Sequence, residues 1–231
     1  MVRPDSTASP SLLERVLGSN LRGELTLIYG EPGSGKTALA LQTAISKARE
    51  GWTTMFIDAD VSLSTERLAQ LSGADLEKIL KLIFVARPTS FHNLTHLLQG
   101  LSNYVNPEMA LIVVDTITSL YRAELMEANV FHMNRELNLQ LGYLAEIAGT
   151  HKLTVILTSQ IRSLPRSGNG ISTIEPVATR VLKYWSKNII RILSTQGSQE
   201  RELVVEKASE PSAVCSRLQT KLANEGFIEA R

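Results

Sequence analysis

Apolar runs alternate with amphipathic stretches along most of this chain, and the alternation predicts strands followed by helices. An uninterrupted apolar run is typical of a strand that a parallel sheet buries on both faces, whereas apolar residues three or four positions apart are typical of a helix. The predicted strands are 25–29, 53–58, 82–86, 110–115 and 153–158. The predicted helices are 37–49, 65–71, 91–103 and 130–148.

The succession of strand, helix and strand predicts an α/β fold with a mostly parallel, doubly wound sheet, because consecutive parallel strands need helical crossovers. We expect the apolar run 110–115 to be the centre of that sheet. Beyond Gln160 the pattern changes, and residues 187–193, 201–206 and 213–220 have the pattern of strands separated by turns. They predict an antiparallel extension at the carboxyl end of the same sheet.

The length and composition suit a single domain that spans residues 1–231. With 43% hydrophobic residues, a chain of this length can bury one large α/β core. Within it we expect a flexible lead at 1–10, followed by a short helix and a linker at 11–24. Residues 161–176 combine turn formers with arginines and little apolar spacing, which predicts a mobile loop of functional length.

Cysteine usage and hydropathy exclude several classes of protein. The single cysteine, Cys215, excludes an internal disulfide framework and a cysteine-rich zinc site, and it fits a reducing compartment. The first residues lack the apolar core of a signal peptide, and no segment approaches 18 uninterrupted apolar residues. We therefore expect a cytoplasmic protein that has no membrane partner.

Residues 30–37 read Gly-Glu-Pro-Gly-Ser-Gly-Lys-Thr, which is a complete phosphate-binding loop of the form G-x-x-x-x-G-K-T between a predicted strand and a predicted helix. Its glycines let the backbone N–H groups point at phosphate oxygens, and the following helix adds the partial positive charge of its N-terminus. Lys36 is expected to reach the β- and γ-phosphates, and the Thr37 hydroxyl to ligate Mg²⁺. The residues predicted to contact the nucleoside triphosphate are Glu31, Pro32, Gly33, Ser34, Gly35, Lys36 and Thr37.

A second part of a nucleotide site follows the apolar run 111–114, where Asp115 ends the strand. In proteins with a phosphate-binding loop, a carboxylate in this position holds Mg²⁺ beside the hydroxyl of the loop. We therefore predict that Thr37 and Asp115 form the metal site. The alternative for Asp115 is an ordinary cap at the end of a strand.

Two further residues are candidates for catalysis together with Lys36. Asp60 follows the strand 53–58 at the end where ligands bind in open α/β sheets, so it could orient the attacking water. Its alternative is a solvated loop residue or a helix cap. Gln160 ends another core strand, where an amide could sense the γ-phosphate, and its alternative is a polar strand terminus.

Positive charge gathers behind Gln160, although the formal net charge of the whole chain is only +1. Residues 161–191 contain six basic residues and one acidic residue, a net charge of +5, so the remainder carries −4. Such a stretch predicts salt-sensitive contacts with the phosphates of single-stranded DNA, the alternative being a solvated face. Tyr184 and Trp185 could stack on bases, although we expect one of them to pack into the core. The predicted DNA-binding residues are Arg162, Arg166, Arg180 and Lys183.

These motifs together resemble a known family. The strings are Phe-Ile-Asp-Ala-Asp at 56–60, Glu-Arg-Leu at 66–68, Val-Val-Asp-Thr-Ile-Thr-Ser-Leu-Tyr-Arg-Ala-Glu at 113–124 and Thr-Ser-Gln at 158–160. From about residue 12 to about residue 228, the chain resembles the ATPase core of the archaeal RadA and RadB recombinases, which belong to the RecA superfamily. RadB is the more similar, because the helix-hairpin-helix domain that RadA carries at its N-terminus is not seen.

The resemblance implies a RecA-like core that binds ATP and Mg²⁺, engages single-stranded DNA through two loops, and works in homologous recombination and DNA repair. It implies recombinase or other repair proteins as partners and places Arg67 over the adenine. In the family, the position of Asp60 is usually Glu. Because the carboxylate here is one methylene shorter, we expect weak ATPase activity and a role as a mediator.

Departures from the family pattern limit what the resemblance implies. The short, acidic segment 124–130 replaces a Gly-Arg-Gly-bearing DNA loop, which weighs against strand exchange. The first phenylalanine is Phe56, so the N-terminal segment has no Phe-x-x-Ala hook of the RadA type, and a homo-oligomer would need another contact. Only Lys207 remains of the basic residues that RadB proteins carry near 206–211. The alternatives are a KaiC-like signalling ATPase and an ATP-binding adaptor that does not hydrolyse.

Overall fold

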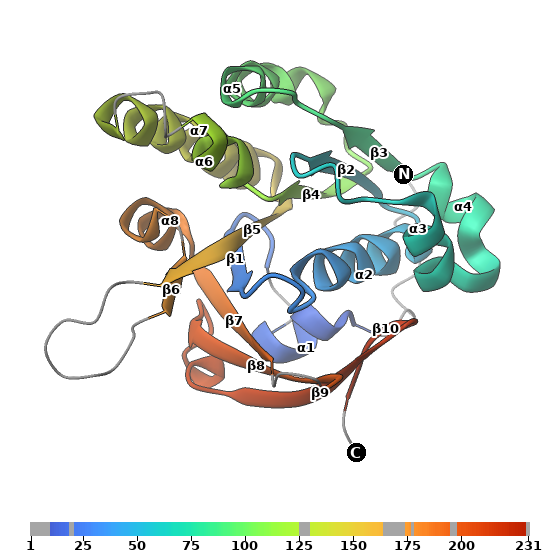
Figure 1. Ribbon diagram of the computed structural model, residues 1–231. Coiled ribbons are helices and arrows are strands. Elements are labelled where there is room, and N and C mark those ends of the chain that lie inside the picture. Colours follow the sequence, from blue (N-terminus) through green and yellow to red (C-terminus); the bar gives the residue numbers. More distant parts are fainter. Residues whose placement is uncertain are drawn as a thin grey trace, which may run out of the picture.

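A twisted sheet of ten strands separates two layers of helices (Figure 1). The structure is a computed structural model that describes residues 10–18, 21–124, 130–163, 174–176, 178–194 and 198–229, with the backbone alone at 162–163, 174–176 and 179. Within these residues the strands are β1 (Leu25–Gly30), β2 (Thr53–Asp58), β3 (Ile83–Ala86), β4 (Met109–Asp115), β5 (Thr154–Ser163), β6 (Ile174–Pro176), β7 (Asn188–Ser194), β8 (Glu200–Lys207), β9 (Arg217–Ala223) and β10 (Gly226–Glu229).

The order across the sheet is β10-β9-β8-β7-β1-β5-β4-β2-β3, and β6 pairs with the end of β5. All neighbours from β7 to β3 are parallel, whereas β8, β9 and β10 join by antiparallel pairing. The sheet is therefore mostly parallel with an antiparallel extension at its carboxyl-terminal side, as the sequence predicts.

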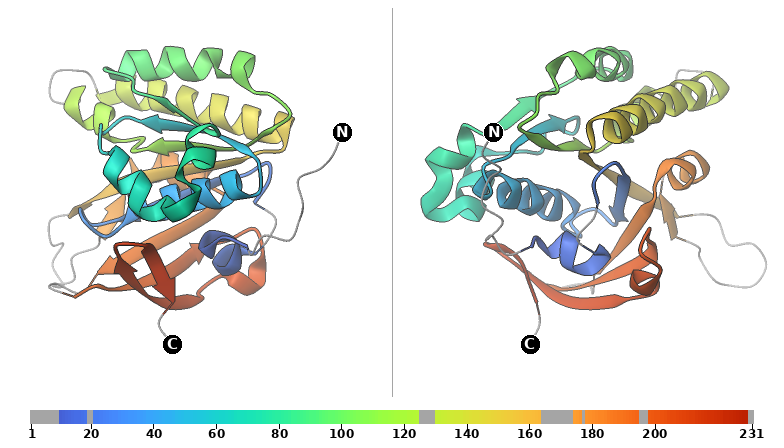
Figure 2. Two further views of the ribbon diagram at one scale, coloured as in Figure 1. Left: turned by 90° about the vertical axis from the view of Figure 1, so that its right-hand side faces the viewer. Right: turned by 180° about the vertical axis from the view of Figure 1, so that it is seen from behind.

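Helices cover both faces of the sheet, as Figure 2 shows from two further sides. The helices are α1 (Leu12–Leu17), α2 (Lys36–Arg49), α3 (Thr65–Ser72), α4 (Leu76–Leu80), α5 (Phe91–Gly100), α6 (Ser119–Glu124), α7 (Val130–His151) and α8 (Thr179–Trp185), with 3₁₀ turns at Gly73–Asp75, Leu101–Tyr104 and Pro211–Ala213. Helices α1 to α4 lie on one face, and α5 to α8 lie on the other. Among the described residues, none of the helices combines the length and the apolarity that spanning a bilayer requires.

Two separate hydrophobic cores follow from the alternation of side chains along the parallel strands. In β1, Ile28 packs in the core beneath α1 to α4, whereas Leu27 and Tyr29 pack in the core beneath α5, α7 and α8. In β4, Val113 packs in the core beneath α1 to α4, and Val114 packs in the core on the opposite face. Successive side chains of a strand point to opposite faces, so a strand that is apolar throughout supplies both cores.

The strand that ends at Asp115 is not the centre of the sheet, contrary to expectation. The central position belongs to β1, because β7 to β10 add to one side of it and the other parallel strands add to the opposite side. The prediction was wrong because the four carboxyl-terminal strands extend the sheet on one side only.

The segment 161–176, expected to be a mobile loop, contains strands at both ends. Residues 161–163 continue β5, and they pair with Ile174–Pro176 of β6 in an antiparallel register. Residues 164–173 lie outside the described residues. Short elements such as α4, α6 and β10 were also not predicted, because each has too few residues to display a period.

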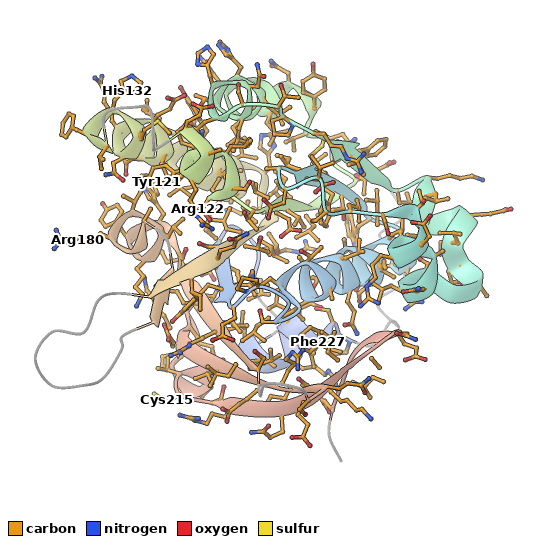
Figure 3. The ribbon with its side chains drawn as sticks, viewed as in Figure 1. Tyr121, Arg122, His132, Arg180, Cys215 and Phe227 are labelled. Carbon is orange, nitrogen blue, oxygen red and sulfur yellow. The ribbon has the colours of Figure 1, made fainter. Side chains whose placement is uncertain are left out.

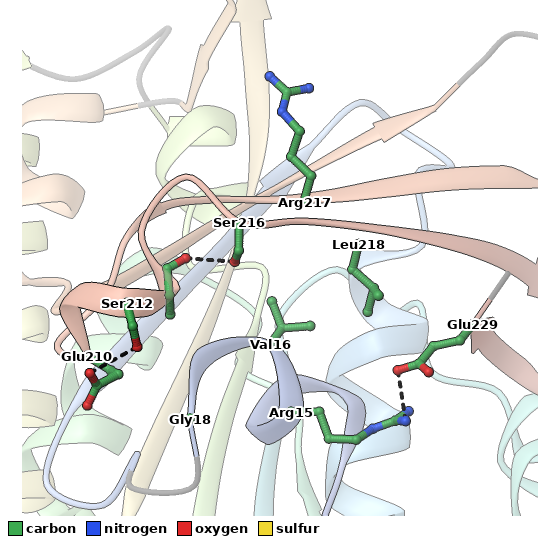
Figure 4. Close-up of a pocket in the computed structure, with 10 residues that line it drawn as sticks. Arg15, Val16, Gly18, Glu210, Ser212, Ser216, Arg217, Leu218 and Glu229 are labelled. Carbon is green, nitrogen blue, oxygen red and sulfur yellow. Dashed lines mark hydrogen bonds and ion pairs between the residues drawn. The ribbon is translucent and has the colours of Figure 1, made fainter. Parts of the chain in front are cut away.

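Helix α1 lies between helix α2 and the carboxyl-terminal strands, and ion pairs join it to both. Ser11 and Glu14 form a reciprocal capping box at its start, and Glu14 also pairs with Lys47 of α2 at 2.7 Å. On the opposite side, Arg15 pairs with Glu229 of β10 at 2.8 Å along the rim of a cleft of about 390 Å³ (Figure 4). The helix thereby connects α2 with β10.

The end of the chain also binds α2 directly. The Gln42 amide nitrogen donates to the carbonyl of Phe227 at 3.1 Å, and the Gln42 carbonyl oxygen accepts from the N–H of Phe227 at 2.9 Å. One side chain thus pairs with both backbone groups of a residue in β10. The Phe227 ring lies in the same core as α1 and α2.

We expect Gln42→Ala to lower the free energy of unfolding by about 1–3 kcal/mol, because both backbone groups of Phe227 lose their partner on α2. Urea denaturation measures the change. The matched control is Gln99→Ala on the exposed face of α5, which should stay within about 0.5 kcal/mol of the parent protein. Equal losses of unfolding free energy in the two variants would show that the bonds from Gln42 to Phe227 do not stabilise the fold.

Candidate functional site

The phosphate-binding loop, residues 30–37, connects β1 to α2 at the carboxyl end of the parallel strands. Gly33 and Gly35 have φ angles of 74° and 104°, a region that residues with a side chain rarely adopt. A Cβ at Gly35 would also lie 2.8 Å from the Phe227 ring, so this position needs glycine for space as well. The Ser34 hydroxyl is buried, and no partner for it is found among the described residues. The loop thus has the backbone shape of a phosphate cradle and an unpaired polar atom within it.

Lys36 is buried at the start of α2, and its ammonium group turns back onto the loop. The Nζ atom donates to the carbonyls of Gly30 at 3.0 Å and Glu31 at 2.8 Å. Burial lowers the pKa of Lys36, while the negative charges of Asp115, Asp60 and Glu31 oppose that shift. Neutral carbonyls compensate poorly for a buried cation, so the site favours an anionic ligand such as a phosphate.

Asp115 is the carboxylate toward which the hydroxyls of the site converge. Its Oδ2 atom accepts a hydrogen bond from Thr37 at 2.7 Å and another from Ser62 at 3.4 Å, and its Oδ1 atom accepts from Thr158. The carboxylate is completely buried. The predicted metal pair, Thr37 and Asp115, is therefore in direct contact.

The electrostatics of Asp115 fit a divalent cation. Burial raises the pKa of Asp115, the hydroxyl groups of Thr158 and Thr37 partly offset this, and the nearby charges of Asp60 and Asp58 raise it further. A hydroxyl and a carboxylate oxygen are hard ligands of the kind that Mg²⁺ uses together with phosphate oxygens. The residues present thus fit Mg²⁺, and Thr37 and Asp115 would hold it.

Asp58, the first of the two acids after β2, has a structural role. It is buried, and it accepts hydrogen bonds from the backbone N–H groups of Ser62 at 2.9 Å and Leu63 at 3.3 Å. It also pairs with Arg87 at 3.1 Å. These three contacts fix the turn that contains Asp60.

Asp60 is exposed beside the end of β4. The N–H groups of Ala59 and Asp60 both donate to the carbonyl of Asp115, at 2.8 and 3.3 Å, which holds the turn against that strand. An Asp60 carboxylate oxygen lies 3.5 Å from the Thr116 hydroxyl. The turn therefore presents Asp60 at the margin of the site, whereas Asp115 lies inside it.

Gln160 lies beside the first residue of the phosphate loop, because β5 and β1 pair with Gly30 opposite Gln160. Its carbonyl oxygen accepts a hydrogen bond from the guanidinium of Arg122 on α6, which Figure 3 labels. This bond directs the carbonyl toward Arg122 and leaves the amide nitrogen as the donor for other partners. Arg122 is part of the motif at 113–124, but its sequence position gave no sign of this contact.

The carboxyl-terminal strands support the phosphate loop, which the sequence analysis did not anticipate. Arg201 of β8 donates to the carbonyls of Ser34 at 3.2 Å and Gly33 at 3.4 Å. The ring of Phe227, on β10, packs against Gly35 of the same loop. No local pattern could reveal these contacts, because they join residues more than 160 positions apart.

Arg67, predicted to cover the adenine, lies near the start of α3. Its guanidinium donates to the carbonyl of Asn224 at 3.0 Å and to Gln70 at 3.2 Å. Asn224 belongs to the turn between β9 and β10, so Arg67 faces the hairpin that also carries Phe227. Its role toward a nucleotide stays a prediction.

The predicted DNA-binding residues fall into two groups. Arg166 and the side chain of Arg162 lie outside the described residues. Arg180 is exposed on α8, and Figure 3 shows it on the side of the molecule where α7 and α8 lie. Lys183 lies 3.8 Å from Glu206 of β8, so part of its charge is already compensated.

Lys207, the basic residue that remains near 206–211, supports the end of α8. Its ammonium donates to the carbonyls of Ser186 at 2.6 Å and Lys183 at 3.3 Å. These carbonyls belong to the last turn of the helix, where a cation is favourable. In this structure, Lys207 therefore stabilises its own chain.

The sequence matches one protein family and is similar to several known proteins. The family model Rad51 matches residues 5–229. The chain is 34% identical over 200 residues to the DNA repair and recombination protein RadB of Methanococcus maripaludis, covering 85% of this chain and 88% of that protein. It is 33% identical over 201 residues to the protein of the same name from Methanothermobacter thermautotrophicus, covering 85% of each.

A solved structure, the crystal structure of the RadB recombinase, is similar to this fold with a TM-score of 0.77. The sequences are 28% identical, and the match covers 95% of this chain and 96% of the other. The match therefore covers nearly the whole length of both chains.

We expect Asp115→Asn to stabilise the protein at neutral pH in the absence of Mg²⁺ and nucleotide. Because the folded pKa of Asp115 is raised, the folded state binds this proton more tightly than the unfolded chain. Stability is therefore lost as pH rises from the ordinary carboxyl range through the raised pKa. The stability of Asp115→Asn should not fall in this way as pH rises, because Asn does not ionise. Thermal unfolding of both proteins at a series of pH values measures the difference.

The same variant should bind Mg²⁺-nucleotide at least about 10-fold more weakly, the loss expected even for a partner outside the first coordination shell. Glu77→Gln, an exposed carboxylate on α4, is the control and should change stability by less than about 0.5 kcal/mol throughout. A lower melting temperature for Asp115→Asn at neutral pH would show that the buried charge is not destabilising.

Proposed function

The chain belongs to the Rad51 family and, within it, to the RadB proteins, and we propose that it binds ATP and single-stranded DNA in homologous recombination and DNA repair. The family is nucleotide-binding and Mg²⁺-dependent in general. We infer that the protein acts as a mediator beside a recombinase or another repair protein. The short, acidic segment 124–130 supports this assignment over strand exchange.

One observation carries the proposal for ATP: the ammonium of Lys36, the hydroxyl of Thr37 and the carboxylate of Asp115 meet at the end of the parallel strands. When ATP binds, the Nζ atom of Lys36 would leave the carbonyls of Gly30 and Glu31 and donate to the β- and γ-phosphates. Thr37 and Asp115 would hold Mg²⁺, and a bound Mg²⁺ would supply positive charge beside the phosphate oxygens. The N–H groups of the loop and the N-terminus of α2 bind the remaining oxygens.

Hydrolysis is slow in this proposal because Asp60 is short and exposed. The carboxylate orients water from the turn at 59–63, which is fixed through Asp58. A group misplaced by about 1 Å can lose about 100-fold in rate. ATP then serves chiefly as a ligand that changes the affinity for DNA.

The contact between Arg122 and Gln160 supports a connection between the two ligands. Gln160 lies beside Gly30 at the nucleotide site, and it precedes the predicted DNA-binding residue Arg162 by two positions. Arg122 lies on α6, so its bond to Gln160 joins the end of β5 to the helix that follows β4. A γ-phosphate that accepts a bond from the Gln160 amide would therefore act on a residue that is bonded to α6 and lies two positions before Arg162.

We expect the protein to bind a fluorescent oligo-dT with an affinity that differs between ATP, ADP and no nucleotide, as fluorescence anisotropy measures. Lys36→Ala should remove the difference, because the phosphates lose their buried cation. The control is Lys81→Ala, an exposed lysine after α4.

Three results separate the candidate functions. DNA binding that depends on nucleotide supports the RadB-like assignment. Absence of DNA binding in every nucleotide state favours a KaiC-like signalling ATPase with protein partners. DNA binding that responds equally to ATP and to a non-hydrolysable analogue, with no phosphate release, indicates an adaptor that does not hydrolyse.

We expect Asp60→Glu to hydrolyse ATP about 10- to 100-fold faster than the parent protein, because the longer side chain brings its carboxylate nearer to the phosphates. Phosphate release at saturating ATP measures the rate. Asp60→Asn is the companion variant and should lose the residual activity, since an amide cannot accept the proton of water. Equal rates for Asp, Glu and Asn at this position would exclude a role in catalysis.

A further inference from the structure

The outer face of α8 carries an exposed aromatic ring in line with an exposed arginine, and an exposed lysine follows the end of the helix. Leu182 is completely buried beneath the helix, and Trp185 is partly buried on the same side. Arg180 and Tyr184 are four positions apart, so they lie one above the other on the opposite side, and the Tyr184 side chain is 77% exposed. Lys187 follows three positions later and is also exposed.

The Tyr184 ring is supported by a neighbour that is itself fixed. The indole nitrogen of Trp185 donates to Asn138 of α7 at 2.8 Å, and a Cβ at Gly142 would lie 3.7 Å from the indole ring. Tyr184 contacts this indole edge-on, with ring centroids 5.5 Å apart and planes at 90°. A T-shaped contact supports the phenol ring and leaves at least one of its faces free of the indole, so that face is available for a further partner.

The charge around Tyr184 selects the kind of partner. Residues 178–191 contain the basic side chains Arg180, Lys183, Lys187 and Arg191 and no acidic residue. Lys183 is partly compensated by Glu206, but Arg180, one turn before Tyr184, and Lys187, just beyond the end of α8, are both exposed. An aromatic ring beside exposed cations suits a polyanion that carries flat apolar groups, which is the chemistry of a single-stranded nucleic acid.

We propose that Tyr184 is a stacking platform for a base of single-stranded DNA, with Arg180 and Lys187 contacting neighbouring phosphates. The inference rests on the proposed DNA binding and assigns part of it to α8. Trp185 does not stack in this arrangement, because its ring is used in the contact with α7. Stacking tolerates any base, so the platform adds affinity without sequence preference.

Tyr184→Ala should weaken binding of oligo-dT about 10-fold, whereas Tyr184→Phe should bind as the parent protein does. The discriminating probe is an abasic oligonucleotide of the same length, which keeps the phosphates and lacks the bases. Its affinity should be the same for the parent protein and both variants. Arg180→Gln should weaken the binding of both probes equally. The slope of log affinity against log salt concentration should fall by about one, the value for one lost phosphate contact.

Tyr104→Ala is the matched control, because Tyr104 is 66% exposed in the 3₁₀ turn Leu101–Tyr104, and its loss should leave oligo-dT binding unchanged. Equal oligo-dT affinity for Tyr184→Ala and the parent protein would overturn the platform and leave the proposed DNA binding intact. Weaker self-association of Tyr184→Ala at unchanged DNA affinity would overturn it in favour of a protein contact. A parent protein that binds no DNA would overturn both proposals.

Discussion

The nucleotide site depends on the burial of one carboxylate, Asp115. A charged group without a partner in an apolar core is strongly unfavourable, and the fold compensates by directing hydroxyl groups from α2, β5 and the turn after β2 toward it. Those hydroxyls bring three elements together at one point. The remaining demand for positive charge is the property that a Mg²⁺ site needs, so the feature that weakens the protein alone also fits the proposed metal.

A second constraint comes from the far end of the chain. The phosphate loop needs two positive φ angles, and its carbonyls and its glycines are held by side chains of β8 and β10. The antiparallel extension therefore supports the phosphate-binding loop in addition to enlarging the sheet. Gln42 and the ion pair between Arg15 and Glu229 attach that extension to α2 and α1.

The sequence predicted those features that short segments determine. The phosphate loop is contiguous, and the buried strands are marked by apolar runs, so the fold class and most long elements follow from local patterns. The central strand, the support from Arg201 and the bond between Arg122 and Gln160 depend on which distant strands become neighbours. A linear pattern does not contain that information. Tyr184 and Trp185 are an intermediate case, because helical spacing separates them but only the packing against α7 decides which one is exposed.

The position of Phe227 against Gly35 has a consequence for the order in which the protein matures during synthesis. The phosphate loop is made early in this sequence, whereas β10, the strand that covers it, is made long afterwards. A nascent chain that lacks β10 exposes the apolar surface beneath α1 and α2 and has an incomplete cradle for phosphate. The phosphate loop therefore reaches its final support only after β10 has packed against it, so the shape of a local motif depends on the folding of the far side of the sheet.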